Sequence, residues 1–131
     1  MSDPSQSPNP ELMVAAVRDY VAAFEEGNVD RVVALFAADA TVEDPVGTAP
    51  VCGIDAIRSF YGAAMGTGAK LKLEGPVRIA REHVAFPFVV IAEVDGKKIR
   101  VEVIDTFRFD NANRIVEMKA YFGPKNFCDA A

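Results

Sequence analysis

The sequence has few of the side chains that bind transition metals. It contains one histidine and two cysteines, and the cysteines, Cys52 and Cys128, lie far apart in the chain. A structural zinc site needs four Cys or His ligands at short spacings, so we expect no metal centre. A glycine-rich phosphate loop and a Gly-x-Ser-x-Gly motif are missing as well. We therefore expect no cofactor, and any chemistry has to come from carboxylates, tyrosines and apolar surface.

Positive charge is in the minority. There are 14 Lys and Arg residues against 19 Asp and Glu, a net charge of −5 at pH 7. Binding of nucleic acid requires a basic patch that neutralises phosphates, so we expect no nucleic-acid partner. Long apolar runs are also absent: the longest, residues 84–92, contains Pro87. A membrane-spanning helix needs roughly 20 apolar residues, so we expect no membrane partner.

The N-terminal residues lack the basic stretch and the apolar stretch of a secretory signal peptide. We therefore expect a cytoplasmic protein with free thiols. The 131 residues are 50% hydrophobic and 25% charged, which fits one globular domain with a substantial core. We predict a flexible N-terminal tail over residues 1–10, one domain over 11–125 and a C-terminal tail over 126–131.

Helical periodicity dominates the first part of the chain. Asn9 and Pro10 have the residue types of a helix start, and Gly27 is a natural helix end. Between them, apolar side chains recur every three or four positions, which is typical of one buried helical face. These side chains are Met13, Val17, Tyr20 and Phe24.

Two shorter helices are predicted next. The second begins at Asn28 or Asp30 and ends near residues 38–39, and the third follows Gly53 and ends at residues 66–68. The third helix also has one apolar face. Its members are Ile57, Phe60, Tyr61 and Ala64.

From residue 69 onward the apolar residues alternate with polar ones, as in β-strands. The predicted strands lie near residues 69–74, 76–82, 84–94, 97–109 and 114–122. The Asp95-Gly96 pair between two apolar runs predicts a tight hairpin. Helices followed by consecutive antiparallel strands indicate the α+β class, with three N-terminal helices packed on one face of a curved, mainly antiparallel sheet.

One acid falls on an apolar strand face. Asp105 lies between Val103 and Phe107 on the inward side of predicted strand 97–109. An ionised carboxylate is costly there, and no Lys or Arg shares that face. The group should therefore be paired otherwise or stay protonated at pH 7. Taken alone, Asp105 could equally be a structural acid satisfied by backbone or water.

Three more polar groups have ordinary structural explanations when taken one at a time. Tyr20 and Tyr61 are core tyrosines on helices, and Asp44 before Pro45 suits a turn at a strand end. Together with Asp105, however, they would bring two acids and two tyrosines into one apolar cavity. That combination favours a functional site.

Four pieces of sequence carry a family resemblance: Tyr20 and residues 38–45, 60–61 and 103–109. In this order and spacing they resemble the bacterial ketosteroid isomerases, small proteins of the nuclear-transport-factor-2-like (cystatin-like) fold. The resemblance covers about residues 11–125. It implies that the sheet forms a conical half-barrel, and it implies a homodimer.

The resemblance also implies residue roles. Asp44 corresponds to the general base, and Tyr20 and a protonated Asp105 correspond to two hydrogen-bond donors to the C3 oxygen of a 3-ketosteroid. An aspartic acid kept neutral by an apolar site is an established feature of that family. Tyr61 corresponds to a second tyrosine that hydrogen-bonds the first, and Phe36 replaces a third tyrosine placed in the short helix. The implied steroid wall comprises Phe24, Phe60, Phe86, Phe88, Val101, Met118 and Phe122.

The implied activity is isomerisation of Δ5-3-ketosteroids to conjugated Δ4-3-ketosteroids through a dienolate. One alternative is another enzyme of the same fold, such as an epoxide hydrolase or a polyketide cyclase. The epoxide hydrolases of this fold have an Asp-Arg-Asp arrangement in their site. Here Arg100 and Arg108 should point away from Asp105, which weighs against that alternative. The other alternative is a non-catalytic protein that binds sterols or similar apolar molecules, but it would have no need of two inward acids.

A second subunit is also suggested by the sheet. Predicted strand 84–94 is apolar on both faces, with Ala85, Val89 and Ile91 on the side away from the expected cavity. Ile104 of the next strand adds to that side. We therefore expect the outer face to pair with a second copy across an isologous interface.

Overall fold

The computed structural model describes residues 8–129, so residues 1–7 of the predicted tail over 1–10 lie outside the described residues, and Pro10 is already the first residue of a helix. In chain order the elements are α1 (Pro10–Glu26), α2 (Val29–Val33), β1 (Phe36–Glu43), β2 (Val51–Cys52), α3 (Ile54–Gly66), β3 (Lys70–Leu73), β4 (Arg78–Ala80), β5 (His83–Val94), β6 (Lys97–Phe109), β7 (Ile115–Tyr121), the 3-10 helix η2 (Pro124–Asn126) and β8 (Phe127–Asp129).

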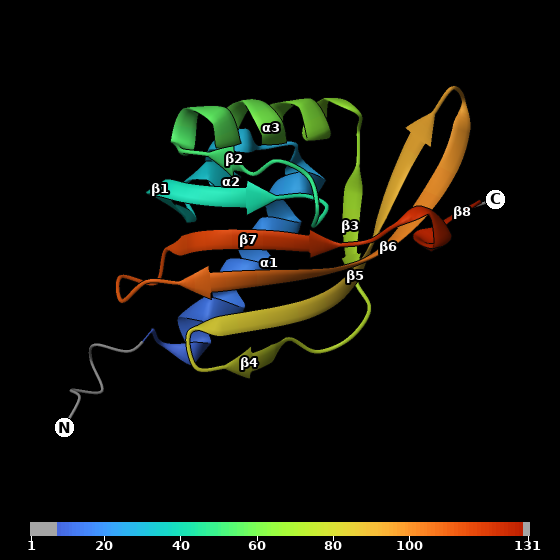
Figure 1. The fold of residues 1–131 in the computed structure, drawn as a ribbon. Coiled ribbons are helices and arrows are strands. Elements are labelled where there is room, and N and C mark those ends of the chain that lie inside the picture. Colours follow the sequence, from blue (N-terminus) through green and yellow to red (C-terminus); the bar gives the residue numbers. More distant parts are fainter. Residues whose placement is uncertain (1–7, 130–131) are drawn as a thin grey trace.

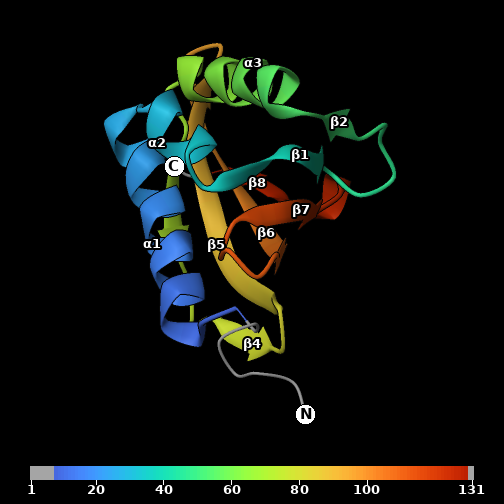
Figure 2. The same ribbon diagram turned by 90° about the vertical axis from the view of Figure 1, so that its left-hand side faces the viewer.

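The strands form one curved sheet, and the three helices lie on one side of it (Figures 1 and 2). The strand order is β2-β1-β7-β6-β5-β3, with β4 added to β5 and β8 added to β6. All strand pairs are antiparallel except β1 and β7, which are parallel. The core lies between the helices and the inner face of the sheet. The predicted α+β architecture is therefore confirmed.

Helix α1 forms where its caps and apolar spacing predict it. The Asn9 side chain accepts a hydrogen bond from the backbone N–H of Glu11 at 2.8 Å, and Pro10 occupies the first turn. Gly27 ends the helix in the left-handed conformation, with φ of 64°. The face predicted to be buried is buried. Its residues are Met13, Val17, Tyr20 and Phe24.

The hairpin of β5 and β6 is the longest paired unit of the sheet, and its tip extends beyond β7 (Figure 1). Asp95 and Gly96 at the tip both have positive φ, 52° and 78°, as a tight two-residue hairpin turn requires. Pairing is continuous from His83 opposite Arg108 to Val94 opposite Lys97. The Asp-Gly signal thus fixes the register that brings Phe86 opposite Asp105.

The second helix is shorter than predicted. It ends at Val33 instead of residues 38–39, and Phe36 is the first residue of β1. The expectation that Phe36 lies in the short helix is therefore wrong. Pairing with a distant strand overrides local helix propensity here, because Phe36 aligns with Ile115 of β7 and the N–H of Ile115 donates to Leu35 O at 2.8 Å.

Two short strands were not predicted. Val51–Cys52 pairs with β1, and Phe127–Asp129 pairs with β6 opposite residues 99–101. The segment 126–131, predicted to be a tail, therefore contains a strand. Elements of two or three residues have no detectable periodicity and form because a neighbouring strand has an unpaired edge.

Both cysteines are free, as predicted, and both are exposed. None of the helices between residues 8 and 129 combines the length and the apolar character that a membrane span requires.

Candidate active site

A cavity of about 270 Å³ lies between α1, α3 and the inner face of the sheet. Its volume is near the lower end of the range for small-molecule pockets, and its lining is mostly apolar, as such pockets usually are. Nine of the residues singled out from the sequence line it: Tyr20, Phe24, Asp44, Phe60, Tyr61, Phe88, Val101, Asp105 and Phe122. The cavity thus brings both acids and both tyrosines together.

Phe86 and Met118 lie elsewhere. Neither is among the cavity-lining residues, and both side chains are fully buried in the core. Phe86 packs edge-on against the rings of Tyr20 and Phe107, with centroids 6.4 and 5.1 Å away. These two residues belong to the hydrophobic core and not to the cavity lining. Strand alternation could not separate Phe86, which lies in the core, from Phe88, which lines the cavity, because both residues fall on the same face of β5.

Sequence reasoning did not assign the other lining residues to the site. They are Ala64, Thr67, Ala69, Leu71, Val90, Ala92, Ile99, Val103, Ala120 and Phe127. Strand alternation placed Val103 on the inner face and gives Val90 the same face as Phe88, so both could have been assigned to the cavity from the sequence. Phe127 could not, because it reaches the cavity only through the pairing of β8 with β6.

The two tyrosines form a hydrogen-bonded pair. The hydroxyl oxygens of Tyr20 on α1 and Tyr61 on α3 are 3.0 Å apart, and the rings meet edge to face. Burial raises the pKa of both hydroxyls well above the usual value, and the nearby carboxyls raise it further. Both phenols therefore keep their protons at neutral pH and remain hydrogen-bond donors.

Asp105 is the one charged residue that is buried within residues 8–129, with 1% of its surface exposed. Neither carboxyl oxygen has a hydrogen-bond partner among the described residues. Burial raises the pKa of this carboxyl well above its usual range, the charge of Asp44 raises it further, and the Tyr20 hydroxyl acts in the opposite direction. Asp105 is thus a protonated acid on the cavity wall with its O–H unused by the protein.

Asp44 follows directly after β1 and is half-buried. The peptide bond between Asp44 and Pro45 is cis. The loop is anchored on both sides, because the N–H of Val46 donates to Ala120 O at 2.8 Å and that of Gly47 donates to Glu43 Oε2 at 2.7 Å. Burial raises the pKa of the Asp44 carboxyl to about 6. This carboxyl is therefore ionised at neutral pH and is a stronger base than a solvated one.

The site therefore contains one carboxylate, one neutral carboxyl and two phenols in an apolar surround. His, Cys, Asp and Glu side chains nowhere gather in a group of three that could hold a metal within the described part of the chain. A base and two donors of this kind can move a proton on an apolar ligand while they stabilise an oxyanion.

Comparisons with known proteins agree with this geometry. A family model described as a SnoaL-like domain matches residues 17–118. The chain is 40% identical over 110 residues to a steroid Delta-isomerase of Nocardioides simplex, an alignment that covers 84% of this chain and 89% of that protein.

Among solved structures, the chain is similar to SalBIII, an epoxide hydrolase/cyclase-like enzyme described for pyran ring formation in polyether salinomycin. The TM-score is 0.87 with 20% identity, over 92% of this chain and 98% of the other. At that identity the similarity bears on the fold alone, and it confirms the predicted fold of three helices packed on a curved sheet.

The protonation state of Asp105 predicts a pH-dependent stability. Because its pKa is raised in the folded protein, Asp105 lowers the free energy of unfolding as pH rises above about 3.9, its unfolded value, until the folded pKa is passed. Asn cannot ionise, so Asp105→Asn should be at least as stable as the wild type at pH 8. Urea denaturation between pH 4 and 8 measures this difference.

The control for removal of an acid is Asp39→Asn, because Asp39 is exposed on β1 of the same sheet. A loss of several kcal/mol at pH 8 in Asp105→Asn alone would instead mean that Asp105 is ionised and paired in the folded protein.

Proposed function

The chain belongs to the SnoaL-like family and to the steroid Delta-isomerases within it, and we propose that it converts Δ5-3-ketosteroids to conjugated Δ4-3-ketosteroids with Asp44, Tyr20 and Asp105 as catalytic residues. One observation carries the proposal: a carboxylate with a pKa of about 6 and a buried carboxyl without a partner line the same apolar cavity. A protein that only stored apolar molecules would gain nothing from this costly pair of acids.

Asp44 carries the proton. Its carboxylate removes a proton from C4, which lies between the C3 ketone and the double bond, and the electron pair moves into a dienolate. The protonated Asp44 then delivers the proton to C6, and the double bond becomes conjugated with the ketone. The proton balance closes within one turnover, so a single carboxylate is sufficient. A pKa of about 6 keeps the base ionised at neutral pH and raises its proton affinity toward that of the dienolate.

Tyr20 and Asp105 stabilise the dienolate. Negative charge develops mainly on the C3 oxygen, and two donors in an apolar, water-poor site act more strongly on that charge than on the neutral ketone. The Tyr20 and Tyr61 hydroxyls are 3.0 Å apart and either can donate; in this mechanism Tyr61 is the donor, which leaves the Tyr20 O–H free for the substrate. Deprotonation of Asp105 would replace a donor with a repelling anion, so its burial is part of the mechanism.

The apolar lining binds the ring system of the steroid. The wall is formed by aromatic and aliphatic side chains on both sides of the cavity, from the helices and from the sheet. Those that the sequence singled out and that line the cavity are Phe24, Phe60, Phe88, Val101 and Phe122. Contact between the steroid and this wall would exclude water from the C3 oxygen and from the proton that moves between C4 and C6.

The arginines on β6 argue against an epoxide-hydrolase arrangement. Arg100 pairs with Glu74 at 2.7 Å, and Arg108 lies 3.7 Å from Glu117, both on the side of β6 away from Asp105. No guanidinium lines the cavity among the described residues. A water held between two carboxylates and an arginine therefore has no counterpart in this site.

Asp44→Asn should lower kcat by about 10²- to 10⁴-fold, the usual contribution of a general base, while steroid binding persists. In the wild type, kcat/KM should fall as pH drops below about 6, because the protonated Asp44 cannot accept a proton. The measurement is the ultraviolet absorbance of the conjugated enone formed from 5-androstene-3,17-dione. The control is Asp39→Asn, because Asp39 is an exposed acid on β1, the strand that Asp44 follows. Full turnover in Asp44→Asn would remove Asp44 from the mechanism.

Tyr20→Phe should lower kcat by about 10²- to 10³-fold, as expected for loss of one of two oxyanion donors. The matched control is Tyr121→Phe, since Tyr121 is exposed and lies outside the cavity lining. The same absorbance assay applies. A loss below about tenfold would show that Asp105 alone supplies most of the stabilisation.

A homodimer is part of the proposal. Ile104 on β6 and Tyr121 on β7 are cross-strand neighbours on the outer face, and 48% and 46% of their surfaces are exposed. Val89, expected on the same face, is buried and would contribute less. Such an exposed apolar pair suits an isologous contact between two copies. Solution X-ray scattering at micromolar protein should give the mass of a dimer, and the mass of a monomer would contradict the interface.

A further inference from the structure

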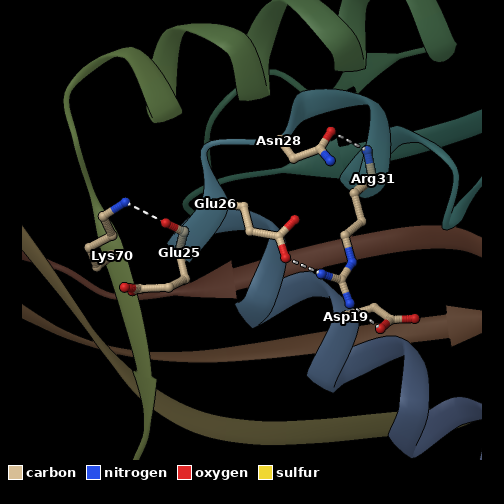
Figure 3. A network of polar contacts seen from close by, with 6 residues as sticks. All are labelled: Asp19, Glu25, Glu26, Asn28, Arg31 and Lys70. Carbon is tan, nitrogen blue, oxygen red and sulfur yellow. Dashed lines mark hydrogen bonds and ion pairs between the residues drawn. The ribbon is translucent and has the colours of Figure 1, made fainter.

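Lys70, the first residue of β3, reaches across to the end of α1 (Figure 3). Its ammonium donates hydrogen bonds to Glu25 O at 2.7 Å and to Phe24 O at 3.3 Å. The last carbonyls of a helix have no partner within the helix, and a cation beside them is favoured by the helix dipole. Lys70 therefore caps α1 from a different element of the fold.

Both ends of this contact belong to the cavity wall. Phe24 lines the cavity, and its ring contacts those of Tyr20 and Tyr61, with centroids 5.4 and 5.9 Å away. On the other side, Ala69 and Leu71, the chain neighbours of Lys70, line the same cavity. Since alternate residues of a strand point to opposite faces, the Lys70 side chain lies outside the cavity while its neighbours face into it.

Among the described residues, the other polar side-chain contacts of α1 lead to α2 and α3 and not to β3. Arg31 of α2 pairs with Asp19 at 2.8 Å and with Glu26 at 2.6 Å, which joins α1 to α2 (Figure 3). β3 is an edge strand, and its ladder joins it to β5 only. Lys70 thus ties the helix that carries Phe24 directly to the sheet edge that carries Leu71.

We propose that Lys70 is a positioning residue that holds Phe24 and Leu71 together as one wall of the substrate cavity and thereby sets the affinity for the apolar body of the substrate. The inference rests on the proposed function, because it takes the steroid ring system as the ligand of this wall. Its effect falls on binding, since Asp44 follows β1 and Asp105 lies on β6, outside the two elements that Lys70 joins. The hydroxyl of Tyr20 on α1 is held separately, 3.0 Å from that of Tyr61 on α3. Lys70 itself does not touch the substrate.

The test compares Lys70→Met, Lys70→Arg and Lys72→Met with the wild type. Met removes the ammonium but keeps the length of the side chain, Arg keeps a donating cation, and Lys72 is an exposed lysine on the same face of β3. Lys70→Met should raise KM for 5-androstene-3,17-dione by about fivefold and leave kcat within about twofold. Lys70→Arg and Lys72→Met should stay within about twofold of the wild type in both constants. If Lys70→Met does not fold, Lys70→Gln takes its place in the comparison.

Calorimetric titration of the same proteins with the conjugated product, 4-androstene-3,17-dione, gives Kd without any turnover. Kd should rise in parallel with KM. An unchanged KM and Kd in Lys70→Met, even with a lower melting temperature, would show a merely structural cap and overturn the inference, as would an equal loss in Lys72→Met. A wild type that binds the product but does not turn over the substrate would refute the proposed function, and Kd would still decide the role of Lys70.

Discussion

The burial of Asp105 among apolar side chains determines how the rest of the site has to be arranged. The strand β6 presents Val101, Val103 and Phe107 on the same inner face, and Phe86 and Ala120 lie opposite Asp105 on the two neighbouring strands. No cation between residues 8 and 129 compensates the Asp105 carboxyl, so its neutral form is strongly favoured. A neutral carboxyl can donate its proton in a hydrogen bond. Because Asp105 lines the cavity, a ligand bound there can be the acceptor.

The two carboxyl groups reinforce each other's roles because their environments differ. Asp44 is half-buried in an anchored loop at the end of β1, and its pKa of about 6 leaves it ionised at neutral pH. Its negative charge raises the pKa of Asp105 further, so an ionised base and a neutral donor are the mutually consistent state of the pair. Burial and the nearby carboxyl charges also raise the pKa of the two tyrosines, which therefore remain protonated. The cavity thus contains one proton acceptor, Asp44, and several proton donors.

Local signals in the sequence predicted those elements that local interactions determine. The spacing and caps of residues 9–27 predicted α1, the Asp95-Gly96 pair predicted the β5–β6 hairpin, and strand alternation placed Asp105 inside. The boundary of α2, the strand β8 and the core position of Phe86 depend instead on pairing with distant strands and on the curvature of the sheet. The contact of Lys70 with the end of α1 joins residues 45 and 46 positions apart, so nothing in the neighbouring sequence indicated it.

The protonated state of Asp105 at neutral pH is the central claim, and infrared difference spectroscopy tests it most directly. At pH 8 Asp44 is ionised, so the described active-site cavity should retain a single protonated carboxyl. The spectrum of the wild type minus that of Asp105→Asn at pH 8 should then contain the carbonyl stretch of a neutral carboxylic acid in an apolar environment. A difference spectrum that contains only the symmetric and antisymmetric stretches of a carboxylate would contradict it.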